Sequence, residues 1–434
     1  GSSTFDSDEQ FSCCFMGMLM LLADVGKRRR DFFHAVALCG VLVVFMRGTR
    51  AFFGMWSHPA PAGPYKVGSI RGRLPPAPKS RDQGLLAQVH YPRGCGELIA
   101  GAKGYQYCRP EVLRAISEGY KVPHTLLKWI MAERPQVDLS FVPLAAESGQ
   151  GWPIVVFHFG LWGSFEFYTQ FCRDIASMGT IVVMLEHEDG TCITAVDRRT
   201  GHTIEYTEQP PWPYDIIDFN KQFLRQRKAE LCEAVAAIQA AALQDVSVEE
   251  RRTSPMLCTL SHANPQQLIL VGHSFGACSL VNTLCEPPAE LSKCCGTLLL
   301  DLWPGPLTAD ISGTFCEELG ASFPVPHVSL VSQRWSELEW YGPSVTGFGK
   351  RATRCLGAAI VPGSAHYWIS DVQFWAPQWI LRALGVMGPS PADATYKSTL
   401  RATRGALEAF LGSTDGQSLS ADLTKFGMRL IPPK

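Results

Sequence analysis

The feature that most constrains the fold is a series of short apolar runs, rich in β-branched residues, separated by stretches with helical periodicity. Runs of this length that are apolar at every position are typical of strands buried on both faces of a parallel sheet. Their alternation with helices predicts an α/β fold with a mostly parallel central sheet and flanking helices. The expected strands are 153–157 (PIVVF), 180–185 (TIVVML), 268–272 (LILVG), 297–301 (TLLLD), 327–332 (HVSLVS) and 358–363 (AAIVPG).

The domain boundaries follow from changes in composition along the chain. Residues 57–85 are rich in Pro and Gly and indicate an extended linker that leads into one main domain over residues 60–382. Within that domain, residues 220–243 have the pattern of an amphipathic helix that packs on the sheet, with a role at a lipid surface as the alternative. Residues 383–434 are expected to form a helical extension at the C-terminal end.

The motif GHSFG, centred on Ser274, lies directly after the apolar run at 268–272 and before a stretch that favours a helix. A serine in a sharp turn between strand and helix, flanked by two glycines, is the pattern of a nucleophile held above the edge of a sheet. The glycines are needed because the turn brings the backbone close to its neighbours. We therefore expect Ser274 to be a catalytic nucleophile, the alternative being a small residue in a turn.

A serine hydroxyl needs a base to remove its proton, and the base needs a carboxylate to orient it. Asp301 ends an otherwise apolar strand, where a carboxylate is costly to bury without a hydrogen-bonding partner. Asp310 and Asp371 compete for the role of the acid, but neither ends an expected strand. Asp301 is the expected acid, with a helix cap or a surface carboxylate as the alternative.

Two histidines follow Asp301 in the chain, His327 and His366. His366 lies in the loop after the last expected strand, at the edge of the sheet where ligands gather in folds of this kind. His327 begins its strand and therefore lies at the opposite edge. We expect His366 to be the base, and His273, next to the nucleophile, to pack locally.

Two backbone amides are expected to stabilise the oxyanion that develops during attack by the serine. One is the amide of Phe275, directly after Ser274, and the other is the amide of Leu161 in the glycine-containing loop after the strand at 153–157. The alternative for this loop is a simple connection between a strand and a helix.

Several segments together resemble the platelet-activating factor acetylhydrolases, also called lipoprotein-associated phospholipases A2. The resemblance covers roughly residues 60–380 and includes GPYKVG at 63–68, GHSFG, LLLDLWPGPL and GSAHYWISD. It implies an α/β-hydrolase fold and a calcium-independent serine lipase that needs no cofactor. It also implies that Ser274, Asp301 and His366 are the nucleophile, acid and base, and that the amides of Leu161 and Phe275 bind the oxyanion.

Two positions depart from the pattern of this family. Ala277 replaces the glycine that usually follows GHSFG, and we expect it to be tolerated within the helix. Trp162 replaces a smaller residue beside the oxyanion loop, where its ring would change the shape of the acyl pocket. Trp162, Trp303 and Tyr367 are expected to contact substrate, with packing in the core as the alternative for each.

The function expected from these residues is hydrolysis of the sn-2 ester of a glycerophospholipid, such as a platelet-activating factor-like or oxidised short-chain species, through an acyl-enzyme. No metal is needed, because the backbone amides stabilise the charge that a metal would otherwise stabilise. Two alternatives are a general serine carboxylesterase that acts on soluble esters and a lipid-binding protein without catalysis.

The expected partners are phospholipid and a membrane or lipoprotein surface. The net charge of −1 disfavours nucleic acid, and the sequence does not indicate an oligomeric state. Within residues 1–59, the basic run 27–30 precedes an apolar stretch at 32–46, which predicts a signal peptide or membrane anchor, with a docked helix as the alternative. The 15 Cys are scattered, as expected for free thiols, although a set of disulfides stays open.

Overall fold

The structure, a computed structural model, describes residues 59–432 apart from 79, 81, 99–105, 126, 129–140, 211–214, 245–246, 248, 251–253, 308–313, 340–341, 376–377 and 414–415. The apolar stretch at 32–46 and the alternative acid Asp310 therefore lie outside the described residues. Within the described part, no helix combines the length and the apolar character needed to cross a membrane.

A ten-stranded sheet runs through the molecule in the order β1-β2-β5-β4-β8-β9-β10-β11-β12, with β3 paired to β2. Six neighbouring strands are parallel, namely β5, β4, β8, β9, β10 and β11. The strands β1, β2, β3 and β12 pair antiparallel at the two sides. Their bounds are β1 Val67–Arg73, β2 Leu86–Leu98, β3 Phe141–Pro143, β4 Trp152–His158, β5 Ile181–Leu185, β8 Ala263–His273, β9 Cys294–Leu300, β10 His327–Ser332, β11 Cys355–Val361 and β12 Arg429–Leu430. A separate hairpin joins β6 Thr194–Val196 to β7 Thr203–Glu205.

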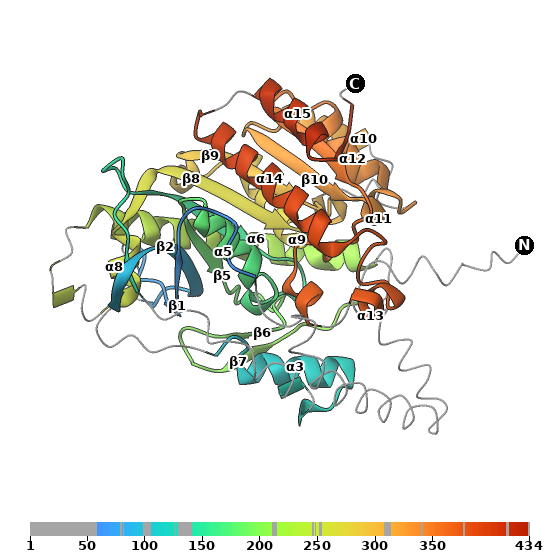
Figure 1. The fold of residues 1–434 in the computed structure, drawn as a ribbon. Coiled ribbons are helices and arrows are strands. Elements are labelled where there is room, and N and C mark those ends of the chain that lie inside the picture. Colours follow the sequence, from blue (N-terminus) through green and yellow to red (C-terminus); the bar gives the residue numbers. More distant parts are fainter. Residues whose placement is uncertain are drawn as a thin grey trace, which may run out of the picture.

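Helices cover both faces of the sheet (Figure 1). The α-helices are α3 Pro110–Tyr120, α5 Thr169–Ser177, α6 Asp215–Leu243, α8 Pro255–Leu260, α9 Phe275–Leu284, α10 Thr314–Ser322, α11 Gln333–Ser336, α12 Gly342–Lys350, α13 Gln378–Ala383, α14 Ala392–Phe410 and α15 Gly416–Lys425. Short 3₁₀ turns lie at Phe165–Phe167, Ala289–Leu291, Gly305–Leu307 and Asp371–Phe374.

Alternate residues of the central strands enter two separate hydrophobic cores. In β4, Val155 and Phe157 face the core that contains α3, α5, α14 and α15, whereas Ile154 and Val156 face the core that contains α6, α8, α9 and α12. A strand packed on both faces has no polar side, which explains why these runs are apolar at every position. The prediction of an α/β fold with a mostly parallel sheet is confirmed.

The amphipathic helix expected at 220–243 is part of α6, and Phe223, Leu231 and Val235 are buried in the second of these cores. The C-terminal segment contains the helices α14 and α15 (Figure 1). Helix α14 packs on β9 and β11. Beyond it, β12 pairs with β11, so this segment shares the main sheet and core.

The prediction of an extended linker at 57–85 is wrong for residues 67–73, which form β1 in register with β2. The prolines of this segment lie before and after the strand, where they cost no ladder hydrogen bonds. Gly68 is required inside the strand because the ring of its cross-strand partner Tyr91 lies where a Cβ would be, 2.7 Å away. The glycine therefore marks close packing and does not indicate a flexible linker.

Candidate active site

Ser274 lies in the turn between β8 and α9 with φ 58° and ψ −123°, a conformation that side-chain-bearing residues rarely adopt. Both flanking glycines are required by close contacts. A Cβ on Gly272 would lie 2.7 Å from the backbone of Ala277, and one on Gly276 would lie 2.2 Å from the carbonyl oxygen of His158. The sharp turn expected from GHSFG is therefore present, and Ala277 lies inside α9.

The loop after β4 lies against Ser274. A Cβ on Gly160 would lie 2.8 Å from the Cβ of Ser274 and 3.2 Å from its Oγ. The next residue, Leu161, is the expected oxyanion donor. Within the described part of the chain, no hydrogen bond uses the amide of Leu161 or of Phe275, whereas the amide of Trp162 donates to the carbonyl of Thr191 at 2.8 Å. Both expected donors are thus uncommitted beside the serine.

Asp301 follows the last residue of β9, is fully buried and has φ 44°. Its carboxylate accepts hydrogen bonds from the amide of Ser332 at 2.5 Å, from the Ser332 hydroxyl at 2.6 Å and from Nδ1 of His366 at 2.9 Å. Burial raises the pKa of Asp301, and the two hydrogen bonds from Ser332 oppose that rise. The net result is a pKa raised to about 7, and the hydrogen bonds offset only part of the cost of burying this carboxylate.

His366 lies in the loop after β11, and its ring stacks on Trp335 with centroids 4.3 Å apart. Burial lowers the pKa of His366 below its ordinary value, so the imidazole is neutral at pH 7. Because Nδ1 donates to Asp301, the neutral ring carries its lone pair on Nε2, the atom that a general base uses.

His273 precedes Ser274 in the chain, and its side chain bonds to the backbone of His366. Its Nε2 donates to the carbonyl of His366 at 2.9 Å, and its Nδ1 accepts from the hydroxyl of Tyr168 at 2.9 Å. Among the described residues, no hydrogen bond joins Ser274 Oγ to His366. A hydrogen bond between a serine and a histidine in such an arrangement is often long or poorly aligned without a ligand and tightens when one binds.

The alternative residues lie elsewhere and have other partners. His327 contacts Phe323 and Phe348, and its Nδ1 donates to the carbonyl of Val325 at 3.2 Å. Asp371 accepts from the amide of Gln170 at 3.0 Å and from the hydroxyl of Tyr107 at 2.8 Å. Of the described candidates, Asp301 is the carboxylate bonded to His366.

The three aromatic residues expected to contact substrate have different neighbours. The ring of Tyr367 lies 5.3 Å from that of His366, and the buried ring of Trp303 lies 6.0 Å from that of Phe275. Trp162 has φ 57°, and its ring packs edge-on against Tyr120 of α3 at 4.6 Å. Contact of these side chains with substrate stays a prediction.

Ser332 and Trp335 contribute to the site but were not expected from the sequence. The sequence does place Ser332 at the end of an expected strand. That strand, β10, lies beside β9, which ends directly before Asp301. Only the pairing of β9 with β10 shows that the two residues meet. Trp335 belongs to the short helix α11, which no apolar periodicity marks.

His273, Asp301 and His366 also place potential metal-ligand atoms within 4.8 Å of one another. Both nitrogens of His273 and both oxygens of Asp301 already take part in hydrogen bonds within the protein. These atoms therefore act as hydrogen-bonding groups within the protein.

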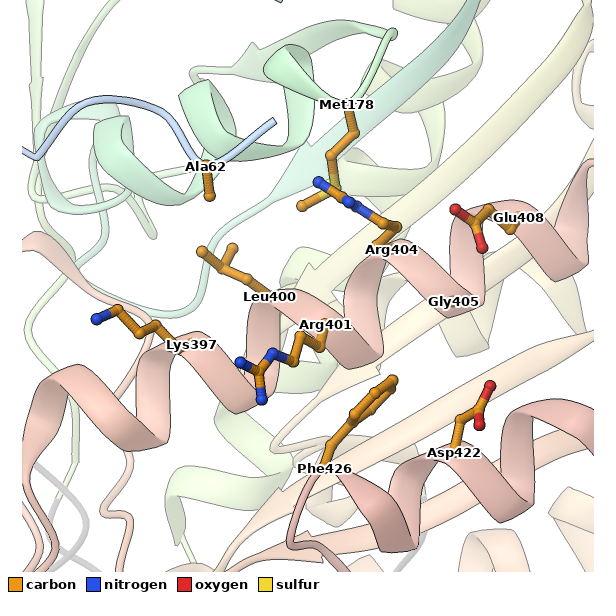
Figure 2. A pocket seen from close by; sticks show the side chains of 10 residues that line it. All are labelled: Ala62, Met178, Lys397, Leu400, Arg401, Arg404, Gly405, Glu408, Asp422 and Phe426. Atoms are coloured by element: carbon orange, nitrogen blue, oxygen red, sulfur yellow. The ribbon is translucent and has the colours of Figure 1, made fainter. Parts of the chain in front are cut away.

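A separate cavity of about 310 Å³ lies where α14 faces α15 and the end of α5 (Figure 2). Lys397, Arg401 and Arg404 extend from α14 on one side, and Glu408 and Asp422 lie toward the other end (Figure 2). None of the candidate catalytic residues lines this cavity.

Comparison with solved structures finds a similar fold in another protein. A ferulic acid esterase from Streptomyces cinnamoneus superposes with a TM-score of 0.58 at 16% identity, over 87% of this chain and 99% of that one. At this identity the likeness concerns the fold alone.

Comparison of sequences identifies the family. Platelet-activating factor acetylhydrolase of Bos taurus is 24% identical over 38% of this chain and 38% of its own length. The protein of the same name from Cavia porcellus is 22% identical over 61% of this chain and 59% of its own length. The family model for platelet-activating factor acetylhydrolase, isoform II, matches residues 141–424, which is more than half of the chain. The chain therefore belongs to the platelet-activating factor acetylhydrolase, isoform II, family.

Proposed function

We propose that this protein is a serine hydrolase of the calcium-independent phospholipase A2 type, which cleaves the sn-2 ester of glycerophospholipids. The observation that carries the proposal is the placement of Ser274 at a strained strand-to-helix turn, beside the backbone loop 160–161 and the hydrogen-bonded pair Asp301 and His366. Membership of the acetylhydrolase family supports a lipid ester as the substrate.

In the proposed reaction, Nε2 of His366 accepts the proton of Ser274 as its Oγ attacks the ester carbonyl. Asp301 holds the ring and stabilises the imidazolium. The amides of Leu161 and Phe275 donate to the oxyanion of the tetrahedral intermediate. His366 then gives the proton to the leaving lysophospholipid, and the acyl group stays on Ser274.

Water completes the cycle. His366 accepts a proton from the water molecule that attacks the acyl carbonyl. It then gives that proton to Ser274 Oγ as the tetrahedral intermediate collapses and releases the carboxylic acid. Both half-reactions use the same base and the same oxyanion site, so loss of either lowers the rates of acylation and of deacylation.

The experiment is hydrolysis, in EDTA, of matched phosphatidylcholines that carry either an acetyl or a long acyl chain at sn-2. We expect turnover by the wild type and by Ser322→Ala, a control at an exposed position at the end of α10. Turnover by Ser274→Ala should fall to background. Cleavage of short soluble esters without turnover of either phospholipid would instead indicate a general carboxylesterase.

A further inference from the structure

Arg227 is a fully buried cation on the apolar stripe of α6. It lies four residues after Phe223 and four before Leu231, both of which pack in the core beneath the sheet. A guanidinium in such a position is costly unless each of its donors finds a partner. Its partners therefore indicate what this charge does.

The guanidinium has an ionic partner and two contacts with segments of the active site. Nε donates to the carboxylate of Asp189 at 3.1 Å, and Nη2 donates to the Thr191 hydroxyl at 2.6 Å. Nη1 donates to the carbonyl of Phe159 at 2.8 Å. The plane of the same group lies over the ring of Phe275, with 4.9 Å between its central carbon and the ring centroid.

These contacts hold the two backbone segments that carry the expected oxyanion donors. Phe159 precedes Gly160 and Leu161, and Phe275 supplies the second amide. Thr191 fixes the far side of the same loop, since its carbonyl accepts from the amide of Trp162 at 2.8 Å. The Arg227 side chain thus contacts both segments. It bonds to Phe159 before Leu161 and to Thr191, which holds Trp162 after Leu161. It also packs on the ring of Phe275.

We infer that Arg227 is a positioning residue for the oxyanion site, setting the distance between the Leu161 and Phe275 amides. This inference rests on the proposed serine hydrolase function. Lysine keeps the charge and can still pair with Asp189, but it lacks the planar fork that reaches Phe159 and Thr191 together. Arg227→Lys therefore separates the positioning role from the need to neutralise a buried carboxylate.

The test measures kcat, KM and inhibition by an alkyl trifluoromethyl ketone for Arg227→Lys. In the adduct, Ser274 Oγ bonds to the ketone carbon, its proton passes to His366, and the carbonyl oxygen becomes an anion in the oxyanion site. We expect kcat to fall by about 10- to 100-fold with KM within about twofold, and the inhibition constant to rise by a similar factor.

Arg198→Lys is the matched control, because Arg198 pairs with Glu188 and Glu233, and among the described residues no ion pair or hydrogen bond joins it to residues 159–162. It should leave kcat and the inhibition constant unchanged. If Arg227→Lys does not fold, Thr191→Val and Thr191→Ser test the same network. The valine variant should lose activity and ketone affinity together, and the serine variant, which keeps the hydroxyl, should retain both.

Arg227→Lys with kcat and ketone inhibition within about twofold of the wild type, and only a lower melting temperature, would overturn the inference and leave Arg227 a structural ion pair. The same conclusion follows if Thr191→Val and Thr191→Ser behave alike. If Ser274→Ala keeps full activity on the same substrate, the proposed function itself fails, an outcome distinct from either of these.

Discussion

At the scale of single residues, backbone strain is concentrated where the proposed chemistry takes place. Lys121, Trp162, Ser274 and Asp301 are the described non-glycine residues with left-handed φ, and the last three lie at the candidate site. Such conformations cost about 1–3 kcal/mol each and persist where the surrounding packing enforces them. Here the enforcing contacts include Gly160, Gly276 and the hydroxyl of Ser332.

Asp301→Asn tests the orientation of the base. The amide can donate to Nδ1 of His366 and so favours the tautomer with its proton on Nε2, which cannot accept from Ser274. We expect kcat to fall by about 10³- to 10⁴-fold with little change in KM. Steady-state kinetics on a phospholipid ester measure this effect. Asp371→Asn is the matched control, and a larger kcat loss there would assign the acid to Asp371.

His327 allows a prediction about pH and stability away from the active site. Burial between Phe323 and Phe348 lowers its pKa from 6.5 to about 4. Between pH 4 and pH 6.5, His327 is therefore protonated in the unfolded chain but neutral in the native protein. The wild type consequently loses stability as pH falls from 6.5 to 4.

His327→Asn removes this titration. The free energy of unfolding should then depend less steeply on pH in that window, by at most about 1.4 kcal/mol per pH unit. Denaturant unfolding of both proteins between pH 4 and 7 measures the difference in slope. Identical slopes would mean that His327 is protonated in the native state to the same extent as in the unfolded chain.

At the scale of secondary structure elements, the sequence predicts the strands well because burial on both faces leaves a continuous apolar signal. The same logic identifies Asp301 and His366, since each interrupts or follows such a run at the carboxyl end of a strand. Ser332 and Arg227 could not be assigned roles, because their partners depend on strand pairing and helix packing. β1 is not predicted, because the Pro and Gly content of residues 57–85 indicates an extended linker.

Gly276→Ala tests the packing of α9 on β4. A Cβ there would lie 2.2 Å from the carbonyl oxygen of His158, a backbone atom that cannot move aside cheaply. We expect a lower melting temperature and a loss of kcat of about tenfold or more, because α9 carries the Phe275 amide. In Gly72→Ala the nearest atom, the methyl carbon of Met256, lies 3.7 Å away, so that variant should match the wild type. Equal behaviour of the two variants would contradict the tight packing of the turn.

At the scale of the whole molecule, the candidate residues come together at the carboxyl ends of β8, β9 and β11, the usual position of sites in parallel sheets. The expected contact with a lipid surface is a proposal. The exposure of Trp379 supports it. This residue belongs to α13, in the segment that follows the His366 loop, and is 61% exposed. Indole rings favour the boundary between water and lipid.

Trp379→Ala should weaken binding to phosphatidylcholine vesicles by several-fold while leaving kcat on a short soluble ester unchanged, since Trp379 has no part in the proposed chemistry. Sedimentation with vesicles measures the first quantity. Leu243→Ala, at another highly exposed apolar residue, is the control. Unchanged vesicle binding by Trp379→Ala would remove α13 from the proposed lipid contact.

The most direct test of the central claim is labelling of the folded protein with a fluorophosphonate, followed by intact mass and peptide mapping. An activated serine displaces fluoride and keeps the phosphonyl group, whereas ordinary serines do not react. The account predicts one adduct per chain, located on Ser274, and none in Ser274→Ala. Absence of an adduct, or an adduct on a different serine, would contradict it.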